Sequence, residues 1–362
     1  DVLVLTADVP LVTQTTIGSL LKDSTDVDVN VLSFMPANPF GYGRIVRNSK
    51  QTVCAIVEQK DASQFEQAII ESNSGIIFIA GSRVDQLIGL LDNNNAQSEY
   101  YLTDVIKHAS TMGQRVNATI CTDPNEVNGV NNQQQLSEVE SHYRKRQVDK
   151  LMIEGVKLYD PTRIDIRGEL TVGKDVVIDI NCIFEGEVSL GDNVHIGANC
   201  IIRHTKIESN TNILPMTMID ESIIGHNANI GPFSRLRPGT ECSDDIKIGN
   251  FVETKKALIG KGSKVSHLSY VGDATIGKNV NIGAGTITCN YDGANKFQTI
   301  IEDDVFIGSD TQLVAPVTIG QGATIGAGST ITRNTPEQQL TLSRSKQVSI
   351  SSWKKPIKAE KG

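Results

Sequence analysis

Residues 301–332 read IEDDVFIGSDTQLVAPVTIGQGATIGAGSTIT, and an aliphatic residue followed by a small or acidic one returns every six positions. The pattern begins near Val172-Gly173 and continues through most of the second half of the chain. A six-residue period is typical of a parallel β-helix, in which each repeat forms a short strand and its turn. Three sides close one coil, so residues 18 apart should stack. The expected pairs are Val172 with Leu190, Ile178 with Ile196, Ile301 with Ile319, Ile307 with Ile325, and Leu313 with Ile331.

One polar stretch, TCNYDGANKFQT at residues 288–299, interrupts the repeat. A loop ejected from a solenoid is a frequent place for function. Cys182 and Cys200 are 18 residues apart and should lie one above the other as small core residues. None of the six cysteines stands in a CxxC pair or at zinc-ligand spacing, which favours reduced thiols over disulfides or a metal site.

The first half has a different texture, in which apolar runs alternate with helical patterns. Such alternation favours an α/β sheet with parallel strands. A charged stretch with periodic apolar residues, 136–155, predicts one long helix that links the two halves. The other expected elements are strands at residues 2–5, 27–33, 75–80 and 116–121, and helices at residues 15–21, 62–71, 84–91 and 103–112.

Composition limits the classes of function. The 362 residues carry 34 basic and 42 acidic side chains, a formal net charge of −8. Nucleic acids and membranes are therefore not expected partners, because no overall positive field attracts polyanions and no apolar run approaches the roughly 20 residues of a membrane helix. The chain opens with Asp1 directly before the apolar run 2–5, so we expect it to lack its beginning.

Within the repeat, residues 231–270 hold an unusual number of polar and basic side chains. One interpretation is a solvated face. The other is an anion site, because a guanidinium (Arg237) and an ammonium (Lys255) on neighbouring coils suit a phosphate monoester. His267 would lie near that site with the Glu253 carboxylate available to orient it, as general-base chemistry needs.

Three motifs in the first half are ambiguous when taken alone. Asp8 follows a predicted buried strand, where open α/β sheets bind ligands, but an aspartate there also caps turns. Residues 41–44, GYGR, form either a hairpin turn or a loop that lets the backbone approach a ligand. Residues 129–132, GVNN, supply either a loop amide or a ligand for a metal or a ribose.

These motifs, in this order, resemble one enzyme family along the whole chain. The chain is similar to the bacterial bifunctional N-acetylglucosamine-1-phosphate uridylyltransferase / glucosamine-1-phosphate N-acetyltransferases. The matching strings are TADVPL, GYGRIVR, IVEQKDA, NAQSEYYLTD and GVNN in the first half, and GPFSRLRPG, GNFVETKKA, HLSYVGDA, VNIGAGTITCNYDGANK, VFIGSD and SRSKQ in the second.

The resemblance implies an α/β plus all-β chain with four parts. They are a partial Rossmann-like nucleotidyltransferase domain (1–133), a linker helix (134–156), a left-handed parallel β-helix acetyltransferase domain (157–345) and a basic tail (346–362). It also implies a cytoplasmic homotrimer that makes UDP-N-acetylglucosamine for cell-wall and lipopolysaccharide precursors.

For the β-helix, the resemblance implies acetyl transfer from acetyl-CoA to the amine of glucosamine 1-phosphate, at sites between subunits. His267 would be the general base and Glu253 its orienting residue. Arg237, Lys255, Tyr270 and Asn281 would bind the sugar phosphate. Ala284, Asn290, Tyr291, Ser309, Ala327 and Arg344 would line the acetyl-CoA groove, with an oxyanion donor near Ser309.

For the first half, the resemblance implies attack of N-acetylglucosamine 1-phosphate on the α-phosphorus of UTP, assisted by Mg²⁺. Asp8 and Asn131 match the metal ligands. Thr6, Ala7, Asp8, Gly43, Glu58, Asn73 and Asn131 match positions that contact the nucleotide sugar.

The chain departs from this family at two points. The glycine-rich loop that opens the family's first domain is absent, so we expect uridylyl transfer to be lost. Ala7 stands where the family commonly has glycine, and its methyl group would crowd the uridine side. Two other functions stay open: a β-helix that serves only as a trimerising scaffold on a nucleotidyltransferase, and an acyltransferase acting on another amine.

Overall fold

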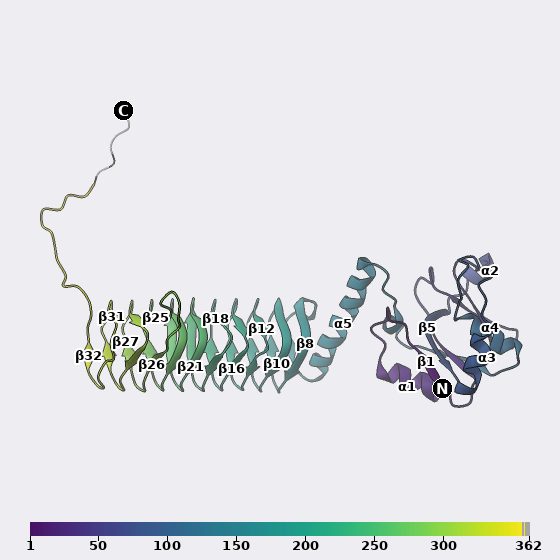
Figure 1. Cartoon of the computed structure of the whole chain (residues 1–362), viewed down its shortest axis with the longest axis horizontal. Coiled ribbons are helices and arrows are strands. Elements are labelled where there is room, and N and C mark those ends of the chain that lie inside the picture. Colours follow the sequence, from purple (N-terminus) through teal and green to yellow (C-terminus); the bar gives the residue numbers. More distant parts are fainter. Residues whose placement is uncertain (357, 359–362) are drawn as a thin grey trace. The chain divides into compact units, whose positions relative to one another are not determined.

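The computed structural model describes residues 1–356 and 358, so the end of the predicted basic tail, including Lys361, lies outside the described residues. The chain divides into two compact units, residues 1–143 and 144–362. The division falls within α5 (Gln133–Ile153), the long helix that the sequence predicts at 136–155 (Figure 1). No helix among the described residues is both long and apolar enough to cross a membrane.

The first unit is built on one sheet with the strand order β4-β3-β5-β2-β6, and β1 also pairs with β5. Only β2 and β6 run parallel; the other pairs are antiparallel, so the predicted parallel sheet is wrong. Short connections such as the turn between β3 and β4 allow only antiparallel pairing. The elements are β1 (Val2–Val4), α1 (Gln14–Lys22), β2 (Val29–Phe34), β3 (Arg44–Arg47), β4 (Val53–Val57), α2 (Gln64–Gln67), β5 (Ser72–Ile79), α3 (Val84–Ile88), α4 (Asp104–Thr111) and β6 (Val116–Ile120).

Both faces of this sheet are covered. Val29 and Val31 of β2 pack in one cluster with residues of α3 and α4, while Leu32 and Phe34 pack in another with Leu20 of α1. The predicted helices occur, but α2 is much shorter than the expected 62–71. A capping box at Ser63 begins it, and the chain enters β5 soon after it ends.

The second unit is a parallel β-helix, as the six-residue period predicts (Figure 1). All its strand pairs run parallel in two sheets of 15 and 11 strands, apart from isolated bridges. Each of the five predicted stacking pairs occurs in the register, for example Leu190 with Val172. Cys182 and Cys200 are buried, free and on adjacent coils.

The strands of the β-helix are short. They are β7 (Lys157–Leu158), β8 (Ile164–Val172), β9 (Val177–Ile178), β10 (Cys182–Leu190), β11 (His195–Ile196), β12 (Ile201–Arg203), β13 (Lys206–Ile207), β14 (Asn212–Ile213), β15 (Met218–Asp220), β16 (Ser222–Ile224), β17 (Asn229–Ile230), β18 (Arg235–Leu236), β19 (Thr240–Cys242), β20 (Lys247–Asn250), β21 (Glu253–Ile259), β22 (Lys264–His267), β23 (Tyr270–Ile276), β24 (Asn281–Ile282), β25 (Ile287–Cys289), β26 (Thr299–Ile301), β27 (Phe306–Ile307), β28 (Gln312–Val314), β29 (Val317–Ile319), β30 (Thr324–Ile325), β31 (Thr330–Ile331) and β32 (Leu340–Thr341).

Side chains that point inward from these strands form one continuous aliphatic core, which runs from Val148 of α5 to Ile331. Burial of each such isoleucine contributes roughly 1.5–3 kcal/mol.

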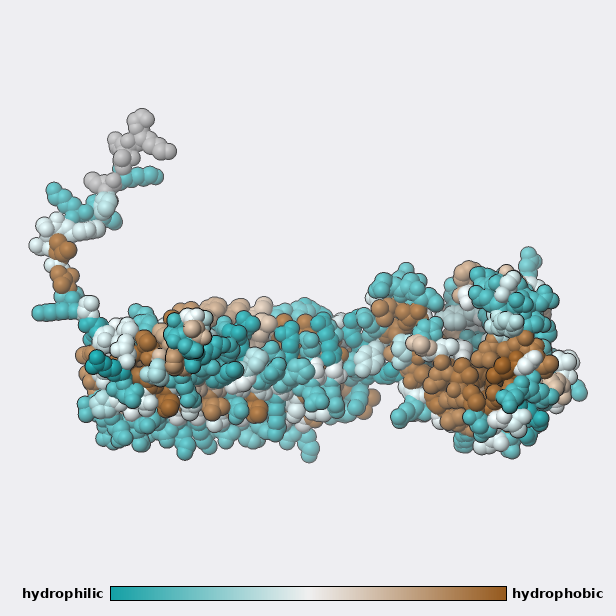
Figure 2. Space-filling model, in the orientation of Figure 1, coloured by the Kyte–Doolittle hydropathy of each residue, from teal (hydrophilic) through white to brown (hydrophobic). Residues whose placement is uncertain are grey.

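The outer surface of the β-helix is largely hydrophilic in Figure 2, whereas the first unit shows a contiguous apolar patch in the same view.

The corners of the β-helix need residues in the left-handed region. Asn181 and Asn199 take this conformation, with φ of 59° and 60°, and the amide of Asn181 donates to that of Asn199 at 2.9 Å. Further along the same corner stand Phe233 and Phe251, whose rings stack 5.5 Å apart, and then Leu268. His267 therefore sits at the last position of a strand, directly before a corner.

The predicted interruption of the repeat is confirmed as a loop of residues 290–298, which leaves the stack between β25 and β26 (Figure 1). Asn290 anchors it at its base: its side-chain amide donates to Asp273, and its carbonyl accepts from Phe297 N at 2.9 Å. An isolated antiparallel bridge joins Tyr291 to Lys296. The loop is therefore held in a hairpin-like form against the coil that carries Asp273.

Candidate functional site

His267 projects from the surface of the β-helix at the end of β22. The coil before it places Asn250 in direct register, and His267 Nδ1 lies 2.8 Å from Asn250 Oδ1. This contact leaves Nε2 as the ring nitrogen available to a substrate. A histidine held by one nitrogen and free at the other has the geometry of a general base.

Glu253 does not contact this ring, so its predicted role as the orienting residue is corrected. Its carboxylate instead binds Arg237, with 2.7 Å between Oε1 and Nη1. The physical reason is the corner at Phe251, which has a φ of 57°. Because the chain turns at this corner, Asn250 lies in the 11-stranded sheet and Glu253 lies in the 15-stranded sheet. Only Asn250 is therefore in register with His267.

Three cations gather beside Glu253. Arg237 and Lys255 occupy the same position on adjacent coils, as the register of β18 and β21 shows. Lys296 comes from the ejected loop, and its close contact with Lys255 and its positive charge lower the pKa of the Lys255 ammonium; Arg237 adds to this effect. Like charges this close repel one another, so the cluster is suited to hold an anion.

Sequence reasoning brought Arg237 and Lys255 together but missed Lys296. The sequence contains a feature that indicates Lys296, because it is the one cation in the loop 288–299. What the sequence did not show is that the loop folds back over the coil that carries Lys255.

Tyr270 stands in register with Glu253, one coil further on. Its ring lies against Gly272: a Cβ placed on that glycine would come 2.4 Å from the Tyr270 hydroxyl. Asn281 lies on the other sheet, in register with Lys264 rather than with His267. The structure therefore groups Arg237, Glu253, Lys255 and Tyr270 on one sheet and places Asn281 apart from them.

A row of small residues continues the ladder of Asn250 and His267 toward the C-terminus. Extending the register of β22 and β24 places Ala284 beside His267. Ser309 follows, since Asp310 N donates to Ala284 O at 2.7 Å, and Ala327 comes next, since Gly328 N donates to Ser309 O at 2.8 Å. Arg344 closes the row by donating to Ala327 O at 3.0 Å.

Asn290 and Tyr291, the other residues predicted to bind acetyl-CoA, lie elsewhere. They follow β25, whereas Ala284 precedes it, so one chain presents the two sets at opposite ends of this strand. Asn290 is buried at the base of the loop, and Tyr291 is exposed. One copy of the chain therefore holds two separate parts of the predicted groove.

In the first unit, the structure brings Asp8 and the segment around Asn131 together. Val130 N donates to Asp8 O at 2.9 Å, and a Cβ on Gly129 would come 3.4 Å from Asp8 Oδ2. A carboxylate and a carboxamide oxygen are ligands that Mg²⁺ accepts, with phosphates and water completing its shell. No cluster of three or more His, Cys, Asp or Glu side chains suited to a metal occurs among residues 1–356 and 358.

The predicted sugar-nucleotide residues form a connected set. Gly43 O accepts from Asn73 N at 2.8 Å, and a Cβ on Gly43 would come 3.2 Å from Glu58 Oε1. Thr6 lies against Gly75, and its buried Oγ1 has no partner among the described residues. Ala7 is exposed in the turn after β1.

Burial raises the pKa of Glu58, although Thr103 donates a hydrogen bond to its carboxylate at 3.1 Å. A cavity of about 430 Å³ opens beside this carboxylate and is lined also by Asp61, Tyr101 and Asp104. A half-buried acid next to a cavity is a feature of ligand sites.

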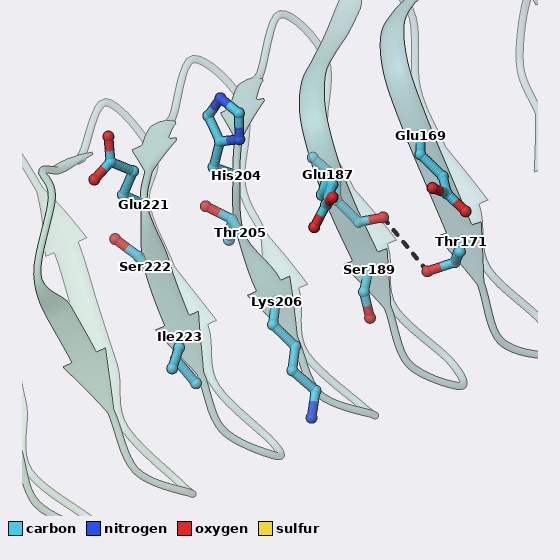
Figure 3. A pocket seen from close by; sticks show the side chains of 11 residues that line it. Glu169, Thr171, Glu187, Ser189, His204, Thr205, Lys206, Glu221, Ser222 and Ile223 are labelled. Carbon is cyan, nitrogen blue, oxygen red and sulfur yellow. Dashed lines mark hydrogen bonds between the residues drawn. The ribbon is translucent and has the colours of Figure 1, made fainter.

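Another hollow, of about 600 Å³, lies on the first coils of the β-helix (Figure 3). Glu169 and Glu187 stand side by side on neighbouring strands there, and His204, Lys206 and Glu221 line the rest. None of the predicted site residues borders this hollow.

Comparisons with known proteins support the sequence resemblance. Residues 166–252 match the GMPPB C-terminal domain family, and residues 298–333 match the bacterial transferase hexapeptide family (six repeats). Among solved structures, the UDP-N-acetylglucosamine acyltransferase from Campylobacter jejuni is 18% identical over 52% of this chain and 71% of its own, with a TM-score of 0.39, a likeness too weak to carry an argument.

Curated relatives are much more similar. The bifunctional protein GlmU of Marinobacter nauticus is 53% identical over 99% of this chain and 79% of its own length. That of Ralstonia pickettii is 51% identical over the same shares of the two chains. The chain thus spans about four-fifths of the length of these relatives. Identity at this level, along both units, shows that the chain belongs to the bifunctional GlmU family.

Proposed function

We propose that the chain makes UDP-N-acetylglucosamine in two transfers, the first of which takes place on the β-helix. There an acetyl group passes from acetyl-CoA to the amine of glucosamine 1-phosphate. The observation that carries this proposal is the continuous row from Asn250 and His267 to Arg344, together with the cluster of three cations on the same β-helix. The row offers a base, and the cations offer a phosphate site.

In this transfer His267 Nε2 takes a proton from the amine of the sugar as the amine nitrogen attacks the thioester carbonyl. A C–N bond forms, the C–S bond breaks, and the CoA thiolate leaves and becomes a thiol by taking up a proton. Ser309 lies two coils from His267 along the row, so its backbone or hydroxyl donor is placed to stabilise the oxyanion.

The three cations select the sugar phosphate. Arg237 supplies a planar fork, and Lys255 and Lys296 supply point charges. A phosphate dianion would relieve the repulsion between the two ammonium groups. Glucosamine without phosphate lacks that interaction, so this cluster supports a sugar phosphate over other amines. Tyr270 and Asn281 would contact the sugar.

We also propose that the enzyme is a homotrimer. Ala284 and Asn290 lie at opposite ends of β25, so a complete acetyl-CoA groove needs a second copy. Four consecutive corner residues with large apolar side chains offer a contact surface: Met216, Phe233, Phe251 and Leu268 are 46%, 51%, 55% and 62% exposed. An unbroken apolar ridge of this kind is typical of an association surface.

For the first unit we propose the second transfer, of a uridylyl group from UTP to N-acetylglucosamine 1-phosphate, in place of the loss expected from the missing glycine-rich loop, because relatives named bifunctional match 99% of this chain. Asp8 and Asn131 would hold Mg²⁺, which neutralises phosphate charge when bound. Thr6, Gly43, Glu58 and Asn73 would contact the nucleotide sugar, as their linked positions and the unpartnered Thr6 hydroxyl suggest.

The free cysteines favour a reducing compartment, the cytoplasm.

The test measures thiol release from acetyl-CoA with glucosamine 1-phosphate or with glucosamine. We expect release only with the phosphate ester, and a loss of about 100-fold or more in His267→Ala. Unchanged acetyl transfer in His267→Ala would favour the scaffold interpretation. For the first unit, pyrophosphate release from UTP and N-acetylglucosamine 1-phosphate should be lost in Asp8→Asn.

A further inference from the structure

We infer that Asn250 is the positioning residue of His267, and that it acts through an uncharged amide. The inference rests on the proposed acetyl transfer and assigns to Asn250 the orienting role that was predicted for Glu253. The observation that supports this inference is the 2.8 Å contact between Asn250 Oδ1 and His267 Nδ1. The two residues face each other across adjacent coils, in a register that the backbone itself fixes.

The backbone around Asn250 leaves little freedom. Leu268 N donates to Asn250 O at 3.0 Å, which locks the two coils together next to the side-chain contact. One residue earlier, a Cβ on Gly249 would come 1.8 Å from Ser266 O, so glycine lets these strands approach closely. The backbone therefore holds the amide of Asn250 in a fixed position against the imidazole, and no long flexible side chain separates the two.

This contact determines which ring nitrogen carries the proton. A carboxamide oxygen only accepts, so it holds a proton on Nδ1 and leaves the lone pair on Nε2, where the base must have it. Without an acceptor at Nδ1, the neutral ring would divide between two tautomers, and the Nε2–H form cannot accept a proton from the amine. The same contact fixes the plane of the ring.

The absence of charge at this position matters as much as the contact. A carboxylate would stabilise the imidazolium and move the acidic limb of the rate profile upward. Along the ladder of His267 the neighbours are Asn250 and Ala284, and the adjoining corner residues Phe251, Leu268 and Gly285 are also uncharged. The charged and titratable side chains on the other sheet near this corner are the paired Arg237 and Glu253, the cation Lys255 and the neutral phenol of Tyr270, and Lys264 lies on β22 itself.

The experiment compares three variants of the full chain. Asn250→Asp keeps an acceptor but adds charge, and it should move the acidic limb of kcat/KM for acetyl transfer upward by about one pH unit. Asn250→Leu removes the acceptor and should lower kcat by about 10- to 100-fold with little change in KM. Asn229→Leu is the matched control, because Asn229 lies on the same sheet at β17, away from the site, and it should change neither value.

Nitrogen-15 NMR of histidine-labelled protein, assigned with His267→Ala, gives a readout that a merely structural role would not move. We expect the Nδ1–H tautomer in the wild type and a mixture of tautomers in Asn250→Leu. An Nε2–H tautomer in the wild type would overturn the inference, and so would an Asn250→Asp profile that matches the wild type. If the proposed acetyl transfer itself were wrong, the wild-type chain would release no thiol. That result distinguishes failure of the proposed function from failure of this inference.

Discussion

The carboxylate of Glu253 lies 2.7 Å from Arg237 Nη1, and the two side chains are 36% and 33% exposed. Glu253 thus binds the cation Arg237 and not the ring of His267. Because the pair is partly solvated, its net strength is modest, roughly 0.2–1 kcal/mol. Arg237 keeps further N–H groups that can bind an anion while this contact persists.

Glu253→Gln should separate these two ends of the site. The amide oxygen can still accept from Arg237, but the negative charge beside the phosphate is lost, so KM for glucosamine 1-phosphate should fall by about two- to fivefold. The acidic limb of the pH–rate profile should stay in place, because Glu253 does not touch His267. Steady-state kinetics between pH 5 and 8 measures both. A moved limb would return Glu253 to the role of orienting residue.

Gly272→Ala should impair sugar binding without unfolding the β-helix. The new methyl group would meet the Tyr270 ring, 2.4 Å from its hydroxyl and 2.6 Å from Cζ, so the ring must swing away. We expect KM for the sugar phosphate to rise by about as much as in Tyr270→Ala, and thermal unfolding to shift by only a few degrees. An alanine variant with wild-type KM would show that the position of this ring is unimportant.

The repeat could be predicted from the sequence because its period is local: each strand and turn occupies six neighbouring residues. The α/β character of the first unit was equally visible, but strand direction was not. Pairing of β2 with β5 depends on long-range register, and the sequence pattern of a buried strand is the same for either direction.

The error over Glu253 has a geometrical cause. Stacking at intervals of 18 residues would place Gly249 beside His267, but this coil is one residue shorter, and Asn250 takes that place. Glu253 is only three residues further along the chain, yet it lies beyond the corner at Phe251. The approach of Lys296 to Lys255 depends on how the ejected loop folds, which no repeat pattern encodes.

Lys296→Met should weaken sugar-phosphate binding, raising KM by about tenfold while kcat changes little, since a hydrogen bond to a charged group contributes roughly 1.5–3 kcal/mol. The backbone bridge of Lys296 with Tyr291 does not need the ammonium, so the loop should keep its form. Lys174→Met, an exposed lysine on an early coil, is the control and should not change KM. Equal KM values for the two variants would remove Lys296 from the phosphate site.

The first unit should lose stability in acid through Glu71, which is 8% exposed. Burial raises its pKa, but hydrogen bonds from Arg47 and Ser33 outweigh that effect and hold the pKa below the ordinary value of 4.5. A lowered folded pKa means that the ionised group stabilises the fold above pH 4.5, and that this contribution disappears as the pH falls through the folded pKa.

Glu71→Gln should therefore cost about 1–3 kcal/mol of the free energy of unfolding at pH 7, because Arg47 loses its countercharge. Between about pH 5 and pH 3, the variant should lose less further stability than the wild type. Hydrogen exchange of the β2 and β5 amides measures this locally, with the exposed Asp26→Asn as control. If the two proteins lost protection in parallel over this pH range, Glu71 would not be the group that responds to acid.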